Sequence, residues 1–206
     1  GAPTAGWTSY APLSTTVYST GSAIDFWIFG LLLVGISSTL GAINFLVTIL
    51  TMRCPGMKLT EMPMFVWSMM VTSAMVLFAT PMITVALIVL FLDRNFGTLY
   101  FSVAGGGDPL IWQNLFWFYS HPAVYIMILP AMGIISEVLP VFSRKPLFGH
   151  QFIAWSSVFI AVLGFAVWAH HMFQVGSPLS FDSFLAAASM VIAVPTCIKI
   201  FNWIST

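Results

Sequence analysis

The chain has 206 residues, of which 59% are hydrophobic and 16% aromatic, while only 6% are charged. A soluble domain with this composition would leave large apolar patches on its surface, so an ordinary soluble protein is excluded and an integral membrane protein is indicated. Six basic and six acidic residues balance to a formal net charge of zero. This balance gives no electrostatic reason to expect nucleic acid as a partner.

Five apolar stretches are long enough to cross a bilayer, at about 20 residues per crossing. In chain order they are Ile24 to Met52, Met64 to Leu92, Ile111 to Val138, Phe152 to Phe173 and Phe184 to Trp203. The residues before Ile24 are rich in Ser, Thr, Gly and Pro, which predicts an exposed segment outside the membrane. We therefore expect an all-α fold, with residues 1–206 forming a single membrane domain, a polytopic transmembrane helix bundle.

The basic residues predict the orientation of this bundle. Two loops on one side hold four of them, whereas the opposite side holds only Arg94; the four are Arg53, Lys58, Arg144 and Lys145. Because Lys and Arg accumulate on the cytoplasmic side, the start of the chain is expected outside. Charged residues near the outer ends, including Asp25, Asp93 and Arg94, are expected to be solvated, to cap helices or to dock neighbouring subunits.

Three of the four histidines, His121, His170 and His171, lie inside the apolar spans. All three reach a similar depth in the outer half, roughly 15 Å below the surface for His121 at about 1.5 Å per residue. Unpaired polar rings are costly in hydrocarbon, so this cluster indicates a functional site. Three neutral imidazoles with an open position suit copper or zinc. Since neighbouring helical residues point about 100° apart, His170 and His171 can share one metal only near a helix end or a distortion.

Tyr125 follows His121 by four residues and therefore shares its helix face, one turn further inward. A phenol beside a redox metal can supply a proton and an electron, which zinc chemistry does not need. The alternative is an aromatic packing residue with a hydrogen-bonded hydroxyl.

Lys199 is the only lysine inside a span, and it lies in the inner half. A lysine at this depth must snorkel, pair or face water. Thr196 precedes it by three residues on the same helix face, and Ser136 lies at the inner end of the third span. From the inside outward, Ser136, Lys199, Thr196 and Tyr125 form a candidate route for protons to the histidines. Snorkelling of Lys199 to the inner interface is the alternative.

Three motifs at these residues resemble subunit I of the heme–copper oxidases, a family of cytochrome c oxidases and quinol-oxidising relatives. They are Trp117-Phe118-Tyr119-Ser120-His121-Pro122-Ala123-Val124-Tyr125, Val167-Trp168-Ala169-His170-His171-Met172-Phe173 and Val194-Pro195-Thr196-Cys197-Ile198-Lys199. The resemblance runs over essentially all 206 residues and covers about the fourth to eighth of the family's twelve helices. We therefore expect this chain to be an internal segment of a longer subunit.

By position, the resemblance implies that His121, His170 and His171 ligate the copper of a binuclear centre, and that Tyr125 is cross-linked to His121. It also implies that Lys199, Thr196 and Ser136 belong to a lysine-type proton channel and that Trp117 lies beside the copper. Two hemes are implied, with axial histidines on helices before and after this segment. The segment alone is therefore not expected to reduce oxygen.

One departure from the common family pattern concerns the second proton channel. Ala123 stands where that pattern has the Glu at which this channel ends. The preceding Tyr119 and Ser120 resemble the bacterial variant in which a Tyr-Ser pair takes over the role; the alternative is that Tyr119 only packs. This variant favours a prokaryotic plasma membrane over a mitochondrion.

The resemblance implies the catalytic subunit of a terminal respiratory oxidase, which reduces dioxygen to water and pumps protons. Its electron donor would be cytochrome c or a quinol, and its partners lipid and oxidase subunits II and III. One rival is an ion transporter or channel that uses the histidines without redox chemistry. Another is a noncatalytic structural subunit, which has no use for three histidines at one depth. A nitric oxide reductase is disfavoured, because such enzymes replace the copper by iron and lack this His-to-Tyr spacing.

Overall fold

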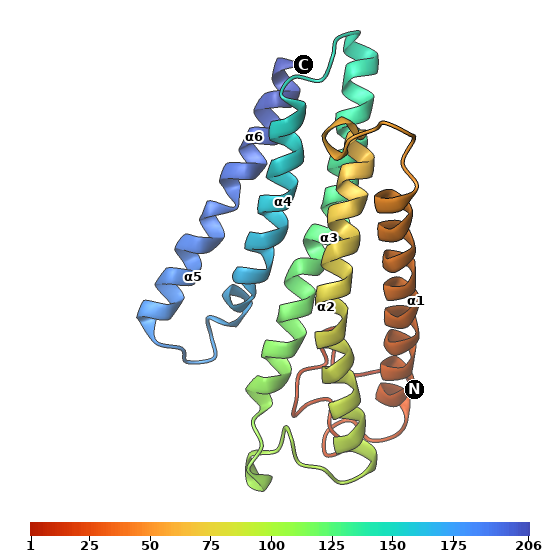
Figure 1. Ribbon diagram of the computed structural model, residues 1–206. Helices are drawn as coiled ribbons and strands as arrows, with labels where there is room; N and C mark the ends of the chain where they lie inside the picture. The colour runs from red at the N-terminus through yellow and green to blue at the C-terminus, as the bar shows by residue number, and fades with distance from the viewer.

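The computed structural model describes all 206 residues and is built from helices, which confirms the expected all-α fold. Its α-helices are α1 (Ala23–Thr51), α2 (Met64–Asn95), α3 (Pro109–Ser143), α4 (His150–Ala166), α5 (Leu179–Val191) and α6 (Ala193–Ser205). Short 3₁₀ turns lie at Leu59–Glu61, Val103–Gly105 and Trp168–Met172. Figure 1 shows α1, α2 and α3 on one flank, α4 with α5 and α6 on the other, and the two termini at opposite ends of the bundle.

Four helical segments are long and apolar enough to cross a membrane, namely α1, α2, α3 and the stretch Leu179–Ser205 that contains α5 and α6. The expected span Phe152 to Phe173 differs, because its α-helix ends at Ala166 and a 3₁₀ turn follows. The 17 residues of α4 rise by ~25 Å and the 5 residues of the turn by ~10 Å. Together they are long enough for a hydrocarbon core of about 30 Å.

Local sequence signals set the ends of α3, the helix that carries His121. Asp108 caps its first turn by accepting a hydrogen bond from the Leu110 N–H, and Pro109 occupies the first helical position. The helix runs on through Pro122 and two further prolines before it ends at Arg144 in the left-handed conformation. Each proline removes one backbone donor, and neighbouring helices make this loss tolerable in a membrane.

The close approach of α2 and α3 depends on a small residue. A Cβ atom added at Gly133 of α3 would lie 2.6 Å from the Ser68 hydroxyl oxygen of α2. Small residues at such points let the backbones of membrane helices pack closely. α2 also supplies Leu87 and Leu90 to an apolar cluster at one end of the bundle, and Met64 and Met75 to a second cluster at the other end.

The N-terminal segment, residues 1–22, folds across the end of the bundle where α1 begins and α2 ends (Figure 1). We expected this segment to be exposed, and the structure corrects that expectation for several of its residues: Ala5, Ser9, Ala11, Ser14 and Ser19 are buried. Trp7 packs edge-on against Trp117 of α3, and the Trp112 indole N–H donates to the carbonyl of Thr8 at 2.9 Å. The segment is therefore part of the packed fold.

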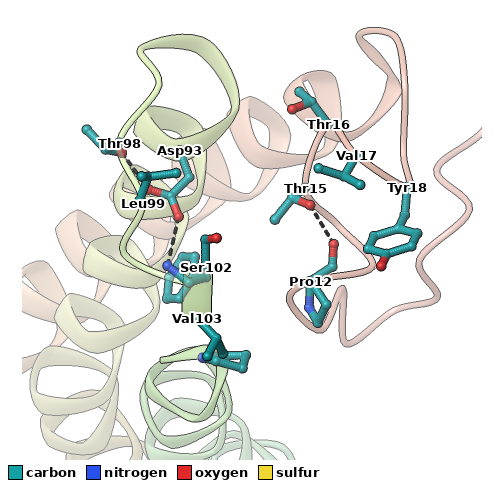
Figure 2. Close-up of a pocket in the computed structure, with 12 residues that line it drawn as sticks. Pro12, Thr15, Thr16, Val17, Tyr18, Asp93, Thr98, Leu99, Ser102 and Val103 are labelled. Atoms are coloured by element: carbon teal, nitrogen blue, oxygen red, sulfur yellow. Dashed lines mark hydrogen bonds between the residues drawn. The ribbon is translucent and has the colours of Figure 1, made fainter. Parts of the chain in front are cut away.

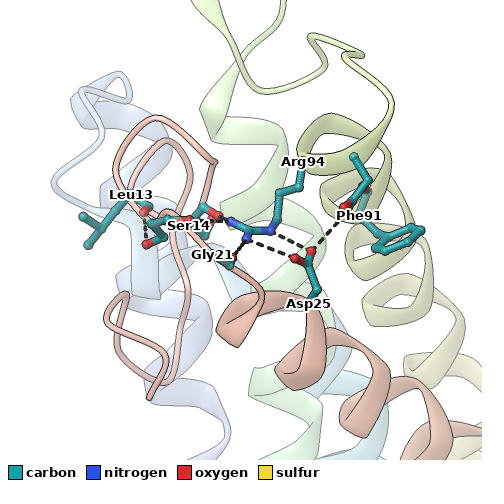
Figure 3. Close-up of polar contacts among 8 residues, drawn as sticks. Leu13, Ser14, Gly21, Asp25, Phe91 and Arg94 are labelled. Atoms are coloured by element: carbon teal, nitrogen blue, oxygen red, sulfur yellow. Dashed lines mark hydrogen bonds and ion pairs between the residues drawn. The ribbon is translucent and has the colours of Figure 1, made fainter. Parts of the chain in front are cut away.

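Arg94, at the end of α2, is the main polar anchor of this segment (Figure 3). Its Nε and Nη2 donate to the Asp25 carboxylate at 2.8 and 3.2 Å, and its Nη2 also donates to the Gly21 carbonyl at 2.8 Å. Its Nη1 donates to the carbonyls of Ser14 and Ser19 at 2.6 and 3.1 Å. Arg94 is only 7% exposed, so the expectation that it is solvated was wrong. The reason is that its fixed fork of donors satisfies three backbone carbonyls that the fold buries.

Asp93, next to Arg94, holds the loop between α2 and α3. Its carboxylate accepts hydrogen bonds from the Thr98 hydroxyl and from the backbone N–H groups of Tyr100 and Phe101. Figure 2 shows this loop facing the N-terminal segment across a cavity of about 340 Å³. Asp93 and Arg94 thus organise two different segments at the same end of the bundle.

Replacement of Arg94 by methionine tests the anchor. Arg94→Met removes the guanidinium donors from the Asp25 carboxylate, which keeps only the Asn95 amide, and leaves three backbone carbonyls without this donor. Loss of one partner of a fully buried ion pair costs about 3–5 kcal/mol, and the part-exposed Asp25 carboxylate reduces this cost. We expect the unfolding temperature of the full-length protein in detergent to fall clearly. Lys145→Met is the matched control, because Lys145 is exposed in a loop at the opposite end. Equal unfolding temperatures for the two variants would contradict the role of Arg94.

Candidate metal centre

The structure brings together the three histidines that the sequence predicts at one depth. His121 lies in α3, whereas His170 and His171 lie in the 3₁₀ turn that follows α4. One ring nitrogen from each can be chosen so that all three lie within 4.8 Å of one another. The α-helix ends at Ala166, before the two consecutive histidines, and their ring centroids lie 4.4 Å apart in the turn, as expected for a pair near a helix end.

The ring nitrogens are spaced as metal ligands. Nδ1 of His121 lies 3.1 Å from Nε2 of His171. Two nitrogens at about 2.0 Å from one tetrahedral metal lie ~3.3 Å apart. The Nε2 atom of His121 is buried and has no hydrogen-bond partner, which is rare for a buried polar atom in a folded protein. A set of imidazoles without carboxylate or thiolate fits copper or zinc.

Ser189 of α5 orients the second histidine of the group. Its hydroxyl oxygen lies 2.7 Å from His170 Nδ1, and its single proton is directed at the Leu185 carbonyl, also at 2.7 Å. The serine must therefore accept the hydrogen bond, and Nδ1 of His170 must donate it. This arrangement leaves the Nε2 lone pair of His170 free to bind a metal.

Trp117 fixes the third histidine. Its ring stacks on that of His171 with centroids 3.8 Å apart and planes 5° from parallel. The Trp117 indole N–H donates to the hydroxyl of Tyr10 at 2.6 Å. Tyr10 belongs to the N-terminal segment, so that segment reaches the histidine group through one tryptophan. The expectation that Trp117 lies beside the site agrees with this geometry.

Tyr125 lies next to His121, as its position four residues later predicts. The two ring centroids are 4.8 Å apart. On its other side the ring packs against α4 at Gly164, where an added Cβ would lie 2.9 Å from the tyrosine Cδ2. Glycine at this position therefore makes room for Tyr125 between α3 and α4.

Of the predicted proton-route residues, Ser136 and Lys199 are buried and Thr196 and Tyr125 are partly buried, and the four do not form one hydrogen-bonded chain. Lys199 of α6 is 1% exposed, which contradicts snorkelling to the interface. Its Nζ donates to the Ser157 hydroxyl of α4 at 2.6 Å. Thr196 donates to the carbonyl of Ile192 in the preceding turn. Lys199 is thus held by a residue that the expected route did not include.

Ser136 also has partners other than Lys199. Its hydroxyl donates to the Met132 carbonyl at 2.8 Å and accepts from the Trp203 indole N–H at 2.9 Å. The Met132 carbonyl can only accept and the Trp203 indole N–H can only donate, so neither contact depends on whether Lys199 is protonated. Ser136 therefore joins α3 to α6 in this structure.

Tyr119 and Ser120 line one cavity of about 270 Å³ between α1, α2, α3 and the N-terminal segment. The hydroxyls of Ser38 and Thr80 lie on its walls as well, among mainly apolar residues. Ser120 is buried and Tyr119 is partly buried. The pair thus lines a mainly apolar cavity together with Ser38 of α1 and Thr80 of α2, and the role of Tyr119 in a proton channel stays a prediction.

Sequence reasoning missed Ser157, Ser189 and Tyr10. A weak signal was present for the first two, because a hydroxyl inside an apolar span needs a partner, and Ser157 even follows Ser156. No local pattern links Tyr10 to Trp117, since the two residues are 107 positions apart.

Comparison with known proteins gives a single family. The family model for cytochrome c and quinol oxidase polypeptide I matches residues 1–206, which is the entire chain. This chain belongs to that family. The resemblance found in the three motifs is therefore confirmed.

Three members of the oxidase family show how much of the subunit is present. Cytochrome c oxidase subunit 1 of Synechocystis sp. is 57% identical over all 206 residues, which cover 37% of that relative. The corresponding subunit of Bacillus sp. PS3 is 53% identical, with 33% of its length covered. Quinol oxidase subunit 1 of Bacillus subtilis is 48% identical, with 32% covered. The chain thus spans about a third of the length of these relatives.

Substitution of Ser189 tests how the site is oriented. Ser189→Ala removes the acceptor that fixes the His170 ring, and loss of such an outer partner lowers metal affinity by about 10–100-fold. We expect this loss when metal binding by the full-length subunit is titrated. Ser189→Thr keeps a hydroxyl and serves as the control. If both variants bind metal equally well, Ser189 does not orient His170.

Proposed function

We propose that this chain is part of the catalytic subunit of a terminal oxidase, which reduces dioxygen to water at a heme–copper centre. The observation that carries the proposal is the group of three histidines at membrane depth, with Tyr125 beside one of them. Membership of the oxidase family supports the same reaction. An ion transporter would need neither a metal at these rings nor a phenol in contact with them.

In this proposal His121, His170 and His171 hold the copper. Copper is favoured over zinc because the reaction of the family is a redox reaction and the ligands are neutral imidazoles. When bound, copper together with a heme iron supplies the electrons for oxygen reduction. The fourth histidine, His150, lies at the far end of α4 from the group and faces the Met62 carbonyl at 3.2 Å. We therefore propose that the heme ligands belong to the rest of the subunit.

Tyr125 is proposed to hold a proton at its hydroxyl and to deliver it at the histidine group. Its ring is fixed between His121 and Gly164, so its position is set before any substrate arrives. The cross-link to His121 that the family resemblance implies stays a prediction. The adjacent rings and the His121 Nε2 atom without a partner support it.

Two routes are proposed to carry protons from the inner face. The first passes Ser136, Lys199 and Thr196 toward Tyr125; the complete burial of the Lys199 side chain supports it, because a buried ammonium needs a functional reason. The second ends at Tyr119 and Ser120, and the cavity that both line supports it. Proton pumping by the whole enzyme is part of this proposal.

The donor, partners and location are proposed from the relatives. We favour cytochrome c as the electron donor, because relatives named cytochrome c oxidase are 57% and 53% identical. A quinol is the second candidate, since a relative named quinol oxidase is 48% identical. Oxidase subunits II and III are the proposed partners. The proposed location is a prokaryotic plasma membrane, with the start of this chain outside.

Removal of one histidine tests the copper site. In the full-length subunit, His170→Ala should abolish stoichiometric copper, because two imidazoles remain where the site uses three ligands. Copper per subunit, measured by atomic absorption, checks this result, and the elution profile in detergent reports folding. Full copper content in a folded variant would contradict the ligand role. It would favour the transporter as the function of the histidines.

Removal of the buried amine tests the first proton route. In the assembled oxidase, Lys199→Met should slow reduction of the oxygen-binding heme, because electrons enter a buried centre only as protons compensate their charge. Stopped-flow absorbance after addition of excess reductant measures this rate. An unchanged rate would contradict the route through Lys199.

A further inference from the structure

The contact between Lys199 and Ser157 is the one hydrogen bond between α6 and α4. The distance from Nζ to Oγ is 2.6 Å, and both residues are nearly inaccessible, at 1% and 2% exposure. No other hydrogen bond to Nζ is present within the chain. A charged amine in an apolar interior therefore depends on this serine for its only protein partner.

The Ser157 hydroxyl suits both states of a group that takes up and releases protons. A charged Lys199 has only donors, so the hydroxyl accepts from it and directs its own proton at the Ile153 carbonyl, 3.2 Å away. A neutral Lys199 offers a lone pair, to which the hydroxyl can donate after rotation. The Ile153 carbonyl then keeps the hydroxyl of Ser156 at 2.8 Å. In both states the Lys199 Nζ, the Ser157 hydroxyl and the Ile153 carbonyl each keep at least one partner.

We propose that Ser157 is a positioning residue for Lys199, which docks the buried amine against α4 and so directs the inner proton route along this helix. The inference rests on the proposed function, because it concerns the lysine of that route. The route thereby includes Ser157 of α4, which the route expected from the sequence leaves out. The side chain of Lys199 rests between α6 and α4 and leaves this serine when it moves toward Thr196 and Tyr125.

The chain offers a matched control for this role. Ser156 lies next to Ser157, is equally buried at 2%, and donates to the same Ile153 carbonyl, but it does not contact Lys199. The variants to compare are Ser157→Ala, Ser157→Thr and Ser156→Ala in the assembled oxidase. The measurements are the reduction rate of the oxygen-binding heme and the rate at which the fully reduced enzyme reacts with oxygen.

We expect Ser157→Ala to slow heme reduction about tenfold, because hydrogen bonds to charged groups are among the strongest in proteins. The oxygen reaction of the reduced enzyme should not change, and this selectivity separates the role from general damage. Ser157→Thr should restore the rate, and Ser156→Ala should stay within about twofold of the unmodified enzyme. Equal rates for Ser157→Ala and Ser156→Ala would overturn the inference.

Lys199→Met distinguishes the possible failures. If Lys199→Met slows heme reduction and Ser157→Ala does not, the lysine route stands and the role of Ser157 is overturned. If Lys199→Met itself has no effect, the route fails, and the positioning role falls with it. Slow reduction in both, with no further slowing in the double variant, supports one shared step.

A second measurement does not depend on turnover. In the oxidase with ¹⁵N-labelled lysine, the Nζ resonance that disappears in Lys199→Met belongs to Lys199. We expect this resonance to shift in Ser157→Ala and to stay in place in Ser156→Ala. An unshifted resonance in Ser157→Ala would overturn the contact itself.

Discussion

The cost of placing polar rings in an apolar interior governs the rest of this structure. Imidazole rings in hydrocarbon need partners, and three of them meet here. They meet past the end of α4 at Ala166, where His170 and His171 lie in a 3₁₀ turn with ring centroids 4.4 Å apart. The 3₁₀ turn shortens the helix that the hydropathy pattern predicts. The three histidines thus meet where the α-helix of an expected span ends early.

Groups far from the histidines keep them in place. On one side, Arg94 holds the N-terminal segment, Tyr10 of that segment binds Trp117, and Trp117 stacks on His171. On the other side, Ser189 of α5 fixes His170. Both supports lie outside the group of three histidines, and each contacts one of them. Such outer contacts orient the rings and so determine how well they bind one metal.

The sequence was sufficient for the helices and for which histidines meet, and insufficient for the residues that support them. The length of the apolar stretches predicted the spans, and the similar depth of the three histidines predicted that they meet. Ser157 and Ser189 could not be paired in advance, because a helix's partners depend on its rotation and tilt, which packing sets. The N-terminal segment looked exposed since its residues are polar, yet Arg94 supplies the donors that let its carbonyls be buried.

The stretch Leu179–Ser205 links the histidine group to the buried lysine. Its outer half, α5, carries Ser189 at the histidine group, and its inner half, α6, carries Lys199. Between them the helix is interrupted at Ile192, the Thr196 N–H makes a long bond of 3.4 Å to the Ile192 carbonyl, and Pro195 has no backbone donor. This weak point of the backbone ladder lies between the serine that supports His170 and the buried lysine, so the two side chains are placed by two separate helices of one span.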